Sequence, residues 1–214
     1  MTKSEKRALA AEVADRLEKL YPTAECALEY GGDPWRLLVM ARLSAQCTDA
    51  RVNVVSRELF SRFPTAEAMA SADVIEIEEI VKPCGLYHMK AANIKDASKM
   101  LITDFGGRVP DTMQELLRLH GVGRKIANLI LGDVYAKPAV VCDTHCIRIC
   151  GRLGLYPEKL KDPTKVERIL RELIDLSRGS DFCHRIVIFG REICSARAPR
   201  CSECPMNDIC RGRK

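Results

Sequence analysis

Apolar side chains recur at helical spacing along most of the chain. In the first twenty residues Leu9, Val13 and Leu17 fall on one helical face, and Pro22 follows them. Asp33 and Pro34 offer an N-cap and a first helical position for a second helix. The alternation of a half-buried strand is nearly absent, and we interpret the apolar run 138–142 as an extended connection, because an isolated strand is not stable. The pattern predicts an all-α protein.

The same periodicity, with glycine and proline as breakers, predicts the remaining helices. They are expected at residues 35–46, 48–63, 65–70, 73–81, 88–105, 116–119, about 123–131, from 144 onward and 162–174. Thr112 and Glu115 have capping-box spacing ahead of the helix at 116–119. No repeat or long linker interrupts the series, so any domain boundary must be a packing boundary.

Composition narrows the class of protein. Hydrophobic residues make up 47% and charged residues 29%, as in folded globular proteins and unlike disordered ones. No segment approaches the roughly 18 apolar residues of a membrane span. The first residues form a charged amphipathic pattern without the apolar block of a signal peptide, so we expect a cytoplasmic protein and no membrane partner.

The charge is mildly positive and unevenly distributed. Lys and Arg number 34 against 29 Asp and Glu, a net +5, which alone is a weak indication of a polyanionic partner. Acidic residues concentrate in segment 74–80. Basic residues gather at 124–125, at 197–200 and in the last four residues, so the distribution is more informative than the sum.

Eleven cysteines in a chain without an export signal favour metal ligation over disulfides. Cys194, Cys201, Cys204 and Cys210 have the spacing C-x6-C-x2-C-x5-C, which can hold either zinc or an iron–sulfur cluster. A second set lies on one helical face: Cys142, Cys146 and Cys150. It could form a second metal site with His145 or His184, but we favour buried free thiols.

Residues 119–133 read "LHGVGRKIANLILGD", which predicts the end of one helix, a Gly-Val-Gly turn and a basic start to the next. Gly121 and Gly123 would expose backbone N–H groups which, with Arg124, could bind an anion at a helix N-terminus. A DNA phosphate suits this site, and such a contact would be independent of base sequence. The alternative is an ordinary turn whose glycines only permit close packing.

Two charged residues near this turn could carry chemistry. Lys125 either adds a phosphate contact or serves as a nucleophile. Asp143, in "VVCDTHC", could stabilise a cationic sugar-like transition state, orient water or relay protons. Taken singly, Lys125 could be a solvated charge and Asp143 the N-cap of the helix that carries Ile147 and Ile149.

Five motifs in order resemble those of bacterial endonuclease III, the helix-hairpin-helix DNA glycosylases and abasic-site lyases. They are "LSAQCTD", "GLYHMKAANI", "LHGVGRKIANLIL", "CDTH" and the four-cysteine tail, from about Leu37 to Cys210. The resemblance implies two helical modules with a cleft between them. One is a six-helix module at 27–137 that carries the hairpin, and the other, at 1–26 and 138–214, holds a 4Fe-4S cluster on the four tail cysteines.

The resemblance also implies a mechanism and a substrate, duplex DNA with oxidised pyrimidines or abasic sites. Lys125 would attack C1′ of a flipped-out nucleotide, expel the base and form a Schiff base that permits β-elimination, with the help of Asp143. Gln46 and Leu86 would fill the gap left in the duplex. The expected enzyme is a bacterial, nucleoid-associated monomer.

Basic residues in the cysteine tail extend this expectation. Arg197 and Arg200 lie between cluster ligands, where they could face the DNA backbone. Two positions depart from the family: His120 replaces a usual proline before the turn, and Cys142 replaces a usual valine before the aspartate. His120 could contact phosphate when protonated, but the hairpin could also be less rigid.

Two other functions compete with this prediction. An adenine-specific or mismatch glycosylase of the same superfamily would lack a nucleophilic lysine, so Lys125 speaks against it. A non-catalytic helix-hairpin-helix module would only hold DNA, and it would need neither Lys125 nor Asp143.

Overall fold

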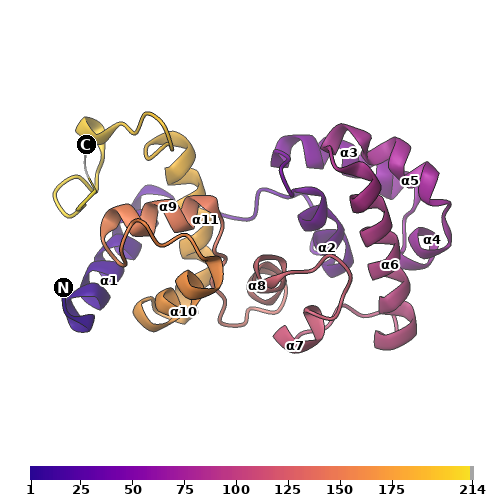
Figure 1. The fold of residues 1–214 in the computed structure, drawn as a ribbon, viewed down its shortest axis with the longest axis horizontal. Helices are drawn as coiled ribbons and strands as arrows, with labels where there is room; N and C mark the ends of the chain where they lie inside the picture. The colour runs from indigo at the N-terminus through magenta and orange to yellow at the C-terminus, as the bar shows by residue number, and fades with distance from the viewer. Residues whose placement is uncertain (213–214) are drawn as a thin grey trace. The chain divides into compact units, whose positions relative to one another are not determined.

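The structure, a computed structural model, describes residues 1–212, which leaves the last two residues of the basic tail outside it (Figure 1). Throughout these 212 residues the secondary structure is helical, and no strand is present. The predicted all-α class is confirmed. Residues 138–142 are extended without a ladder partner, as predicted. In the described residues, no helix is long and apolar enough to cross a membrane.

The chain divides into two compact units. Unit 1 combines Met1–Glu25 with Ala136–Lys214, and unit 2 is the continuous segment Cys26–Tyr135. The chain therefore begins in unit 1, builds unit 2 and returns. Each unit has its own buried core.

Unit 2 is organised around α6 and α2. Its helices are α2 (Pro34–Leu43), α3 (Asp49–Arg62), α4 (Ala66–Ser71), α5 (Val74–Val81), η1 (Lys82–Cys84), α6 (Tyr87–Phe105), α7 (Met113–Leu116) and α8 (Arg124–Asp133). The helix α6 packs against α2, α4 and α5, and α2 also contacts α3 and α8. Because α2 has neighbours on several sides, its residues 37–41 are all buried.

Unit 1 is built from the N-terminal and C-terminal segments of the chain. It contains α1 (Lys3–Leu20), α9 (Thr144–Leu153), α10 (Pro163–Leu173), η2 (Leu176–Arg178), α11 (Gly179–Glu192) and η3 (Cys201–Glu203). The N-terminal α1 lies beside α10 and α11 (Figure 1). Arg178 fixes this contact through ion pairs to Asp15 at 2.7 Å and Glu18 at 2.5 Å.

The observed helix ends correct three expectations. The helix expected to run from its Thr112 cap through residue 119 forms as α7 but ends at Leu116, where the chain turns. The helix predicted to reach residue 46 ends at Leu43, where the Ser44 hydroxyl donates to the Met40 carbonyl at 2.9 Å. Sequence reasoning also missed α11, which starts at Gly179 without a side-chain cap.

Most of the predicted caps are formed. Asp33 accepts hydrogen bonds from the backbone N–H groups of Trp35 at 2.9 Å and Arg36 at 3.2 Å, so the predicted start of α2 is confirmed. Thr112 accepts from the Glu115 N–H at 3.3 Å, but its hydroxyl donates to the Glu115 carboxylate, so the reciprocal half of the capping box is not formed there.

Candidate active site and metal centre

The predicted hairpin lies between α7 and α8 in unit 2. Leu119 and Val122 are buried beneath it, and the Val122 N–H donates to the Leu119 carbonyl at 3.1 Å. Gly121 has φ +73°, and a Cβ there would lie 2.5 Å from Arg42 Nε and 3.0 Å from Asn93 Cβ. Packing inside unit 2 is therefore sufficient to explain Gly121.

Gly123 is different, because packing does not explain it. It is the exposed N-cap of α8, with extended backbone, and a Cβ there would meet nothing within 4 Å. No side chain caps α8, whose first internal bond runs from the Ala127 N–H to the Gly123 carbonyl at 3.0 Å. The earlier N–H groups point beyond the helix, which makes this N-terminus suitable for an anion.

The side chains of α8 separate by face. Ala127, Ile130 and Leu131 are buried, whereas Arg124 and Lys125 in the first turn are exposed. Within the described part of unit 2, the Lys125 ammonium has no hydrogen-bond or ion-pair partner. The helix therefore holds a reactive type of side chain at its accessible N-terminal end.

Gln46 and Leu86 share an unusual backbone conformation. Among the non-glycine residues that the structure describes, only these two and Ala136 have positive φ, +55° for Gln46 and +50° for Leu86. Both side chains are exposed, and Leu86 follows the positive-φ Gly85. Left-handed backbone costs free energy for such residues and is found preferentially at functional sites, so it supports a role outside the core.

Asp143 belongs to unit 1, where it is the half-buried N-cap of α9. Its Oδ1 accepts a hydrogen bond from the Cys146 N–H at 2.7 Å. Packing of Ile149, Cys150 and Leu153 fixes α9 in the core of this unit. Asp143 is therefore a helix cap, as the alternative interpretation predicted. Because the residue is only half-buried, its carboxylate remains partly accessible.

The four tail cysteines surround one cavity of unit 1. Cys194, Cys201, Cys204 and Cys210 line it together with apolar side chains that include Phe189 and Met206. Burial raises the pKa of the Cys204 and Cys210 thiols, so thiolate ligands there need compensating charge or metal. Four half-buried thiols around one cavity fit the donor set of an iron–sulfur cluster.

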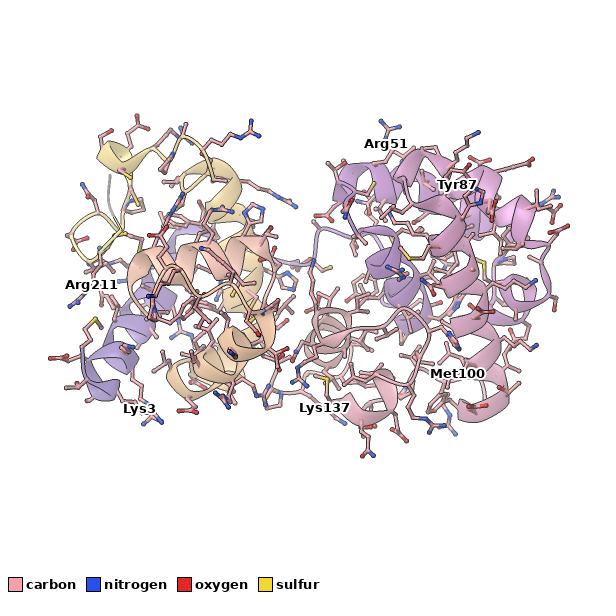
Figure 2. All side chains as sticks on the ribbon, in the orientation of Figure 1. Lys3, Arg51, Tyr87, Met100, Lys137 and Arg211 are labelled. Carbon is pink, nitrogen blue, oxygen red and sulfur yellow. The ribbon has the colours of Figure 1, made fainter. Side chains whose placement is uncertain are left out.

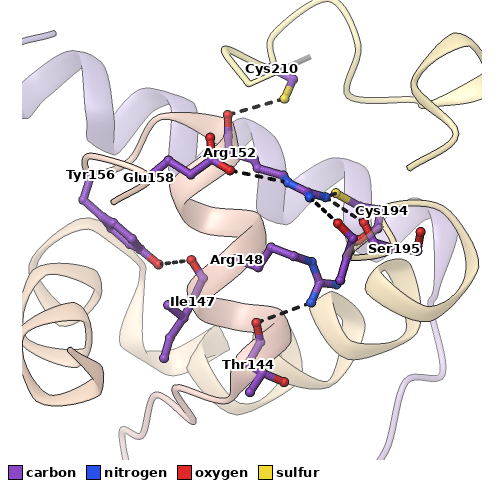
Figure 3. Close-up of polar contacts among 10 residues, drawn as sticks. Thr144, Ile147, Arg148, Arg152, Tyr156, Glu158, Cys194, Ser195 and Cys210 are labelled. Atoms are coloured by element: carbon purple, nitrogen blue, oxygen red, sulfur yellow. Dashed lines mark hydrogen bonds and ion pairs between the residues drawn. The ribbon is translucent and has the colours of Figure 1, made fainter. Parts of the chain in front are cut away.

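Arg152 of α9 supplies a positive charge at this cavity (Figure 3). Its Nη1 donates to Cys194 Sγ at 3.3 Å and to the Ser195 carbonyl at 2.8 Å, and Nη2 donates to the Ala196 carbonyl at 2.9 Å. The guanidinium therefore both fixes the loop after Cys194 and stabilises negative charge on that sulfur. Sequence reasoning missed Arg152, although an arginine on the apolar face of α9 was a usable signal.

The second set of cysteines lies in the core of unit 1, where all of its members are buried. The neighbouring thiols of Cys142, Cys150 and Cys183, followed by burial, raise the pKa of Cys146. We interpret the four as free thiols packed in the core, with Cys183 not foreseen from the sequence.

The two predicted basic residues of the tail differ in their surroundings. The Arg200 guanidinium donates a hydrogen bond to the Glu192 carbonyl and lies 3.7 Å from the Glu203 carboxylate. Arg197 is exposed, and no polar partner for it is found in the described residues. The structure therefore leaves Arg197 the more available cation of the two.

Family models match most of the chain. Residues 39–175 match the HhH-GPD superfamily of base excision DNA repair proteins, and residues 194–210 match the iron–sulfur binding domain of endonuclease III. Endonuclease III of Synechocystis is 44% identical over 206 residues, covering 96% of this chain and 93% of the relative. Endonuclease III of Bacillus subtilis is 41% identical and covers 92% of this chain and 89% of the relative.

Solved structures give the same result in three dimensions. A non-covalent endonuclease III–DNA complex matches with a TM-score of 0.91 and 37% identity over 99% of this chain and 96% of that one. A trapped covalent endonuclease III–DNA intermediate matches equally well, with a TM-score of 0.91 at 37% identity over 99% of this chain and 97% of that one. A thermostable thymine-DNA glycosylase, 22% identical over 98% of this chain and 97% of that one with a TM-score of 0.86, shares the fold.

Proposed function

Because the chain belongs to the endonuclease III family of HhH-GPD base excision DNA repair proteins, we propose that it uses Lys125 and Asp143 to remove oxidised pyrimidines from duplex DNA. The chain is a DNA glycosylase and abasic-site lyase with a 4Fe-4S cluster. The roles of individual residues and the damaged-base specificity belong to the proposal.

The proposed reaction has two covalent steps. The Lys125 amine attacks C1′ of the damaged nucleotide, and the bond from C1′ to the base breaks, so the base leaves with the bonding electrons and a proton. The C1′–O4′ bond then breaks and O4′ takes a proton, so the sugar ring opens and a Schiff base forms between C1′ and the lysine nitrogen, which acidifies C2′. Loss of a C2′ proton then expels the 3′ phosphate by β-elimination, which cuts the strand.

Asp143 assists both steps in this proposal. Its carboxylate stabilises positive charge that develops on the sugar and carries protons to and from the lysine nitrogen. The hydrogen bond from the Cys146 N–H orients the carboxylate. Lys125 comes from unit 2 and Asp143 from unit 1.

DNA binding follows from the open N-terminus of α8. A phosphate can accept hydrogen bonds from N–H groups in the first turn of α8 and meet the positive charge of Arg124, without contact to any base. Gly123 favours close approach, because it has no side chain. Gln46 and Leu86 are exposed on two turns of the same unit, and they would occupy the space that the flipped nucleotide leaves.

The cluster holds the C-terminal tail in this proposal. Cys194, Cys201, Cys204 and Cys210 would bind it, and it would supply a covalent staple at the end of unit 1. We further propose that the enzyme is monomeric and acts at the nucleoid of a bacterial cell. Size-exclusion chromatography with light scattering, with and without a duplex, tests the oligomeric state.

One observation supports the lysine assignment best: Lys125 is exposed and unpartnered in the described part of unit 2, at a helix end suited to phosphate. Borohydride added to protein and a duplex with one oxidised pyrimidine should reduce the Schiff base and trap a covalent complex. Lys125→Ala should abolish the adduct. Lys99→Ala, which removes an exposed lysine of α6, is the control and should trap normally.

A Lys125→Ala protein that still traps DNA at the wild-type level would assign the attack to another amine. A wild-type protein that releases the base but never yields an adduct would instead favour the mismatch-type glycosylase, which leaves the strand intact. The two activities are therefore scored separately, as free base and as cut strand.

A further inference from the structure

Lys90 is a fully buried lysine of unit 2, with 0% exposure. It lies in the first turn of α6, four residues after Leu86. Burial of an ammonium is costly, and burial is the main cause of the lowered pKa of Lys90. A lysine at such a site requires hydrogen-bond acceptors that compensate for the lost water.

The acceptors of Lys90 are two backbone carbonyls from separate segments. Nζ donates to the Leu43 carbonyl at 2.7 Å and to the Cys84 carbonyl at 2.7 Å. Leu43 is the last residue of α2, and Cys84 is the last residue of η1. A helix leaves its final carbonyls without intrahelical partners, so the ammonium stabilises two helix ends at once.

Each of these helix ends leads directly into one of the strained turns. Gln46 lies three residues after Leu43, and Leu86 lies two residues after Cys84. Gln46 and Leu86 are two of the three non-glycine residues with positive φ in the described chain. Lys90 is therefore the shared anchor of both turns that expose a proposed insertion residue.

Contacts outside the lysine agree with this arrangement. The helix α3, which follows the Gln46 turn, packs against η1, which precedes the Leu86 turn. Arg51 of α3 and Tyr87 of α6 accordingly lie at the same end of unit 2 (Figure 2). The two turns are neighbours. The side chain that connects the two segments leading into them can therefore set the distance between the turns.

We propose that Lys90 is a positioning residue that sets the separation of the Gln46 and Leu86 turns, and thereby the efficiency with which the enzyme fills the gap in the duplex. The inference rests on the proposed function of Gln46 and Leu86. Lys90 itself is buried and does not touch DNA; it acts through the two carbonyls.

Two substrates separate this role from general stabilisation. Excision of an oxidised pyrimidine from a duplex needs the gap to be filled, whereas cleavage of an abasic site in a single strand leaves no orphan base to replace. Lys90→Met should lower the ratio of the duplex rate to the single-strand rate by about tenfold, the scale for a buried carbonyl without its donor.

The matched control is Lys95→Met. Lys95 also belongs to α6, and its Nζ also donates to a backbone carbonyl, that of Ala72 at 2.7 Å, but that carbonyl ends α4 and not an insertion turn. The same substitution there should leave the ratio within about twofold of wild type. Equal falls of the ratio in both variants would overturn the proposal.

A double-mutant cycle with Leu86→Ala supplies a second readout. If Lys90 acts through the turn, Lys90→Met should cost little more once Leu86 has been removed, and the two effects should be non-additive. Additive effects would reduce Lys90 to a stabilising residue. If Lys90→Met does not fold, Lys90→Gln, which can reach at most one carbonyl, is judged by the same ratio and the same cycle.

The activity of the wild-type protein distinguishes a failure of the proposed function from a failure of the positioning role. If it fails to excise an oxidised pyrimidine from the duplex, the proposed function is wrong. If it excises normally and the Lys90 variants retain the wild-type ratio, only the positioning role is wrong.

Discussion

Asp143 Oδ1 accepts a hydrogen bond from the Cys146 N–H at 2.7 Å, so the proposed catalytic carboxylate is also the N-cap of α9. One side chain therefore has a structural and a chemical role. The two roles require different properties: the cap needs an oxygen acceptor, whereas the chemistry needs a negative charge.

Two substitutions at Asp143 should separate these roles. Asp143→Asn keeps an oxygen for the cap, so the melting temperature should change little while base release slows by about a hundredfold or more. Asp143→Ala should lose the same activity and also about 1 kcal/mol of stability. The measurements are single-turnover base release and thermal unfolding. Near-normal turnover of the asparagine variant would leave Asp143 only the role of a cap.

Local sequence signals predicted helices and caps well, because neighbouring residues determine them. Asp33 with Pro34 marked the start of α2, and Asp143 with Thr144 marked that of α9. The resemblance to endonuclease III is also confirmed, because it rested on several ordered motifs.

Features that depend on distant residues could not be predicted. The burial of Lys90 depends on carbonyls 47 and 6 residues away, which no local pattern relates to it. Gly179 at the start of α11 packs against Ala139, whose carbonyl would lie 2.3 Å from a Cβ at that position. Likewise, only the structure distinguishes Gly121, which packing requires, from Gly123, which it does not.

The two hairpin glycines should respond differently to alanine. Gly121→Ala combines φ +73° with a Cβ 2.5 Å from Arg42 Nε, so it should destabilise the protein by about 1–3 kcal/mol. Gly123→Ala should cost less than about 1 kcal/mol, since its Cβ enters open space. It should nevertheless weaken DNA binding by about tenfold, because the methyl group lies where a phosphate would approach.

Chemical denaturation and equilibrium binding to an abasic-site analogue duplex measure these two effects independently. Unchanged affinity in Gly123→Ala would show that the N-terminus of α8 is not a phosphate site. The ordinary-turn interpretation of the hairpin would then be correct for both glycines.

Two cysteines of unit 2 should resist alkylation near neutral pH. Burial, followed by the effect of Cys47, raises the pKa of Cys84 to about 11, and burial raises the pKa of Cys26 to about 12. Because each pKa lies above the ambient pH, the thiol stays protonated, and at pH 8 only about one Cys84 in a thousand is the reactive thiolate.

Iodoacetamide labelling of the native protein, followed by peptide mass spectrometry, measures this resistance. The labelling rate of Cys84 should rise by about tenfold per pH unit between pH 8 and pH 10, as the thiolate fraction rises. Protein unfolded in urea is the control, and both residues should label rapidly there. Rapid labelling of native Cys84 at pH 8 would contradict the raised pKa.

The loop between the first two tail cysteines carries two arginines with different surroundings. Arg197 is exposed and unpartnered in the described residues, whereas Arg200 bonds to the Glu192 carbonyl and lies 3.7 Å from Glu203. Pro199 and the bond from the Arg200 N–H to the Ile193 carbonyl at 3.0 Å restrict the loop, so Arg197 is held on a stiff segment.

If this segment meets DNA, each arginine that contacts a phosphate contributes about −0.9 to the slope of log affinity against log salt. Arg197→Ala should then flatten the slope by about one unit and weaken binding equally on damaged and undamaged duplexes. Arg200→Ala should do so less, because its charge is already partly neutralised by Glu203. Wild-type slopes in both variants would remove the loop from the DNA-binding surface and leave the cluster a structural role alone.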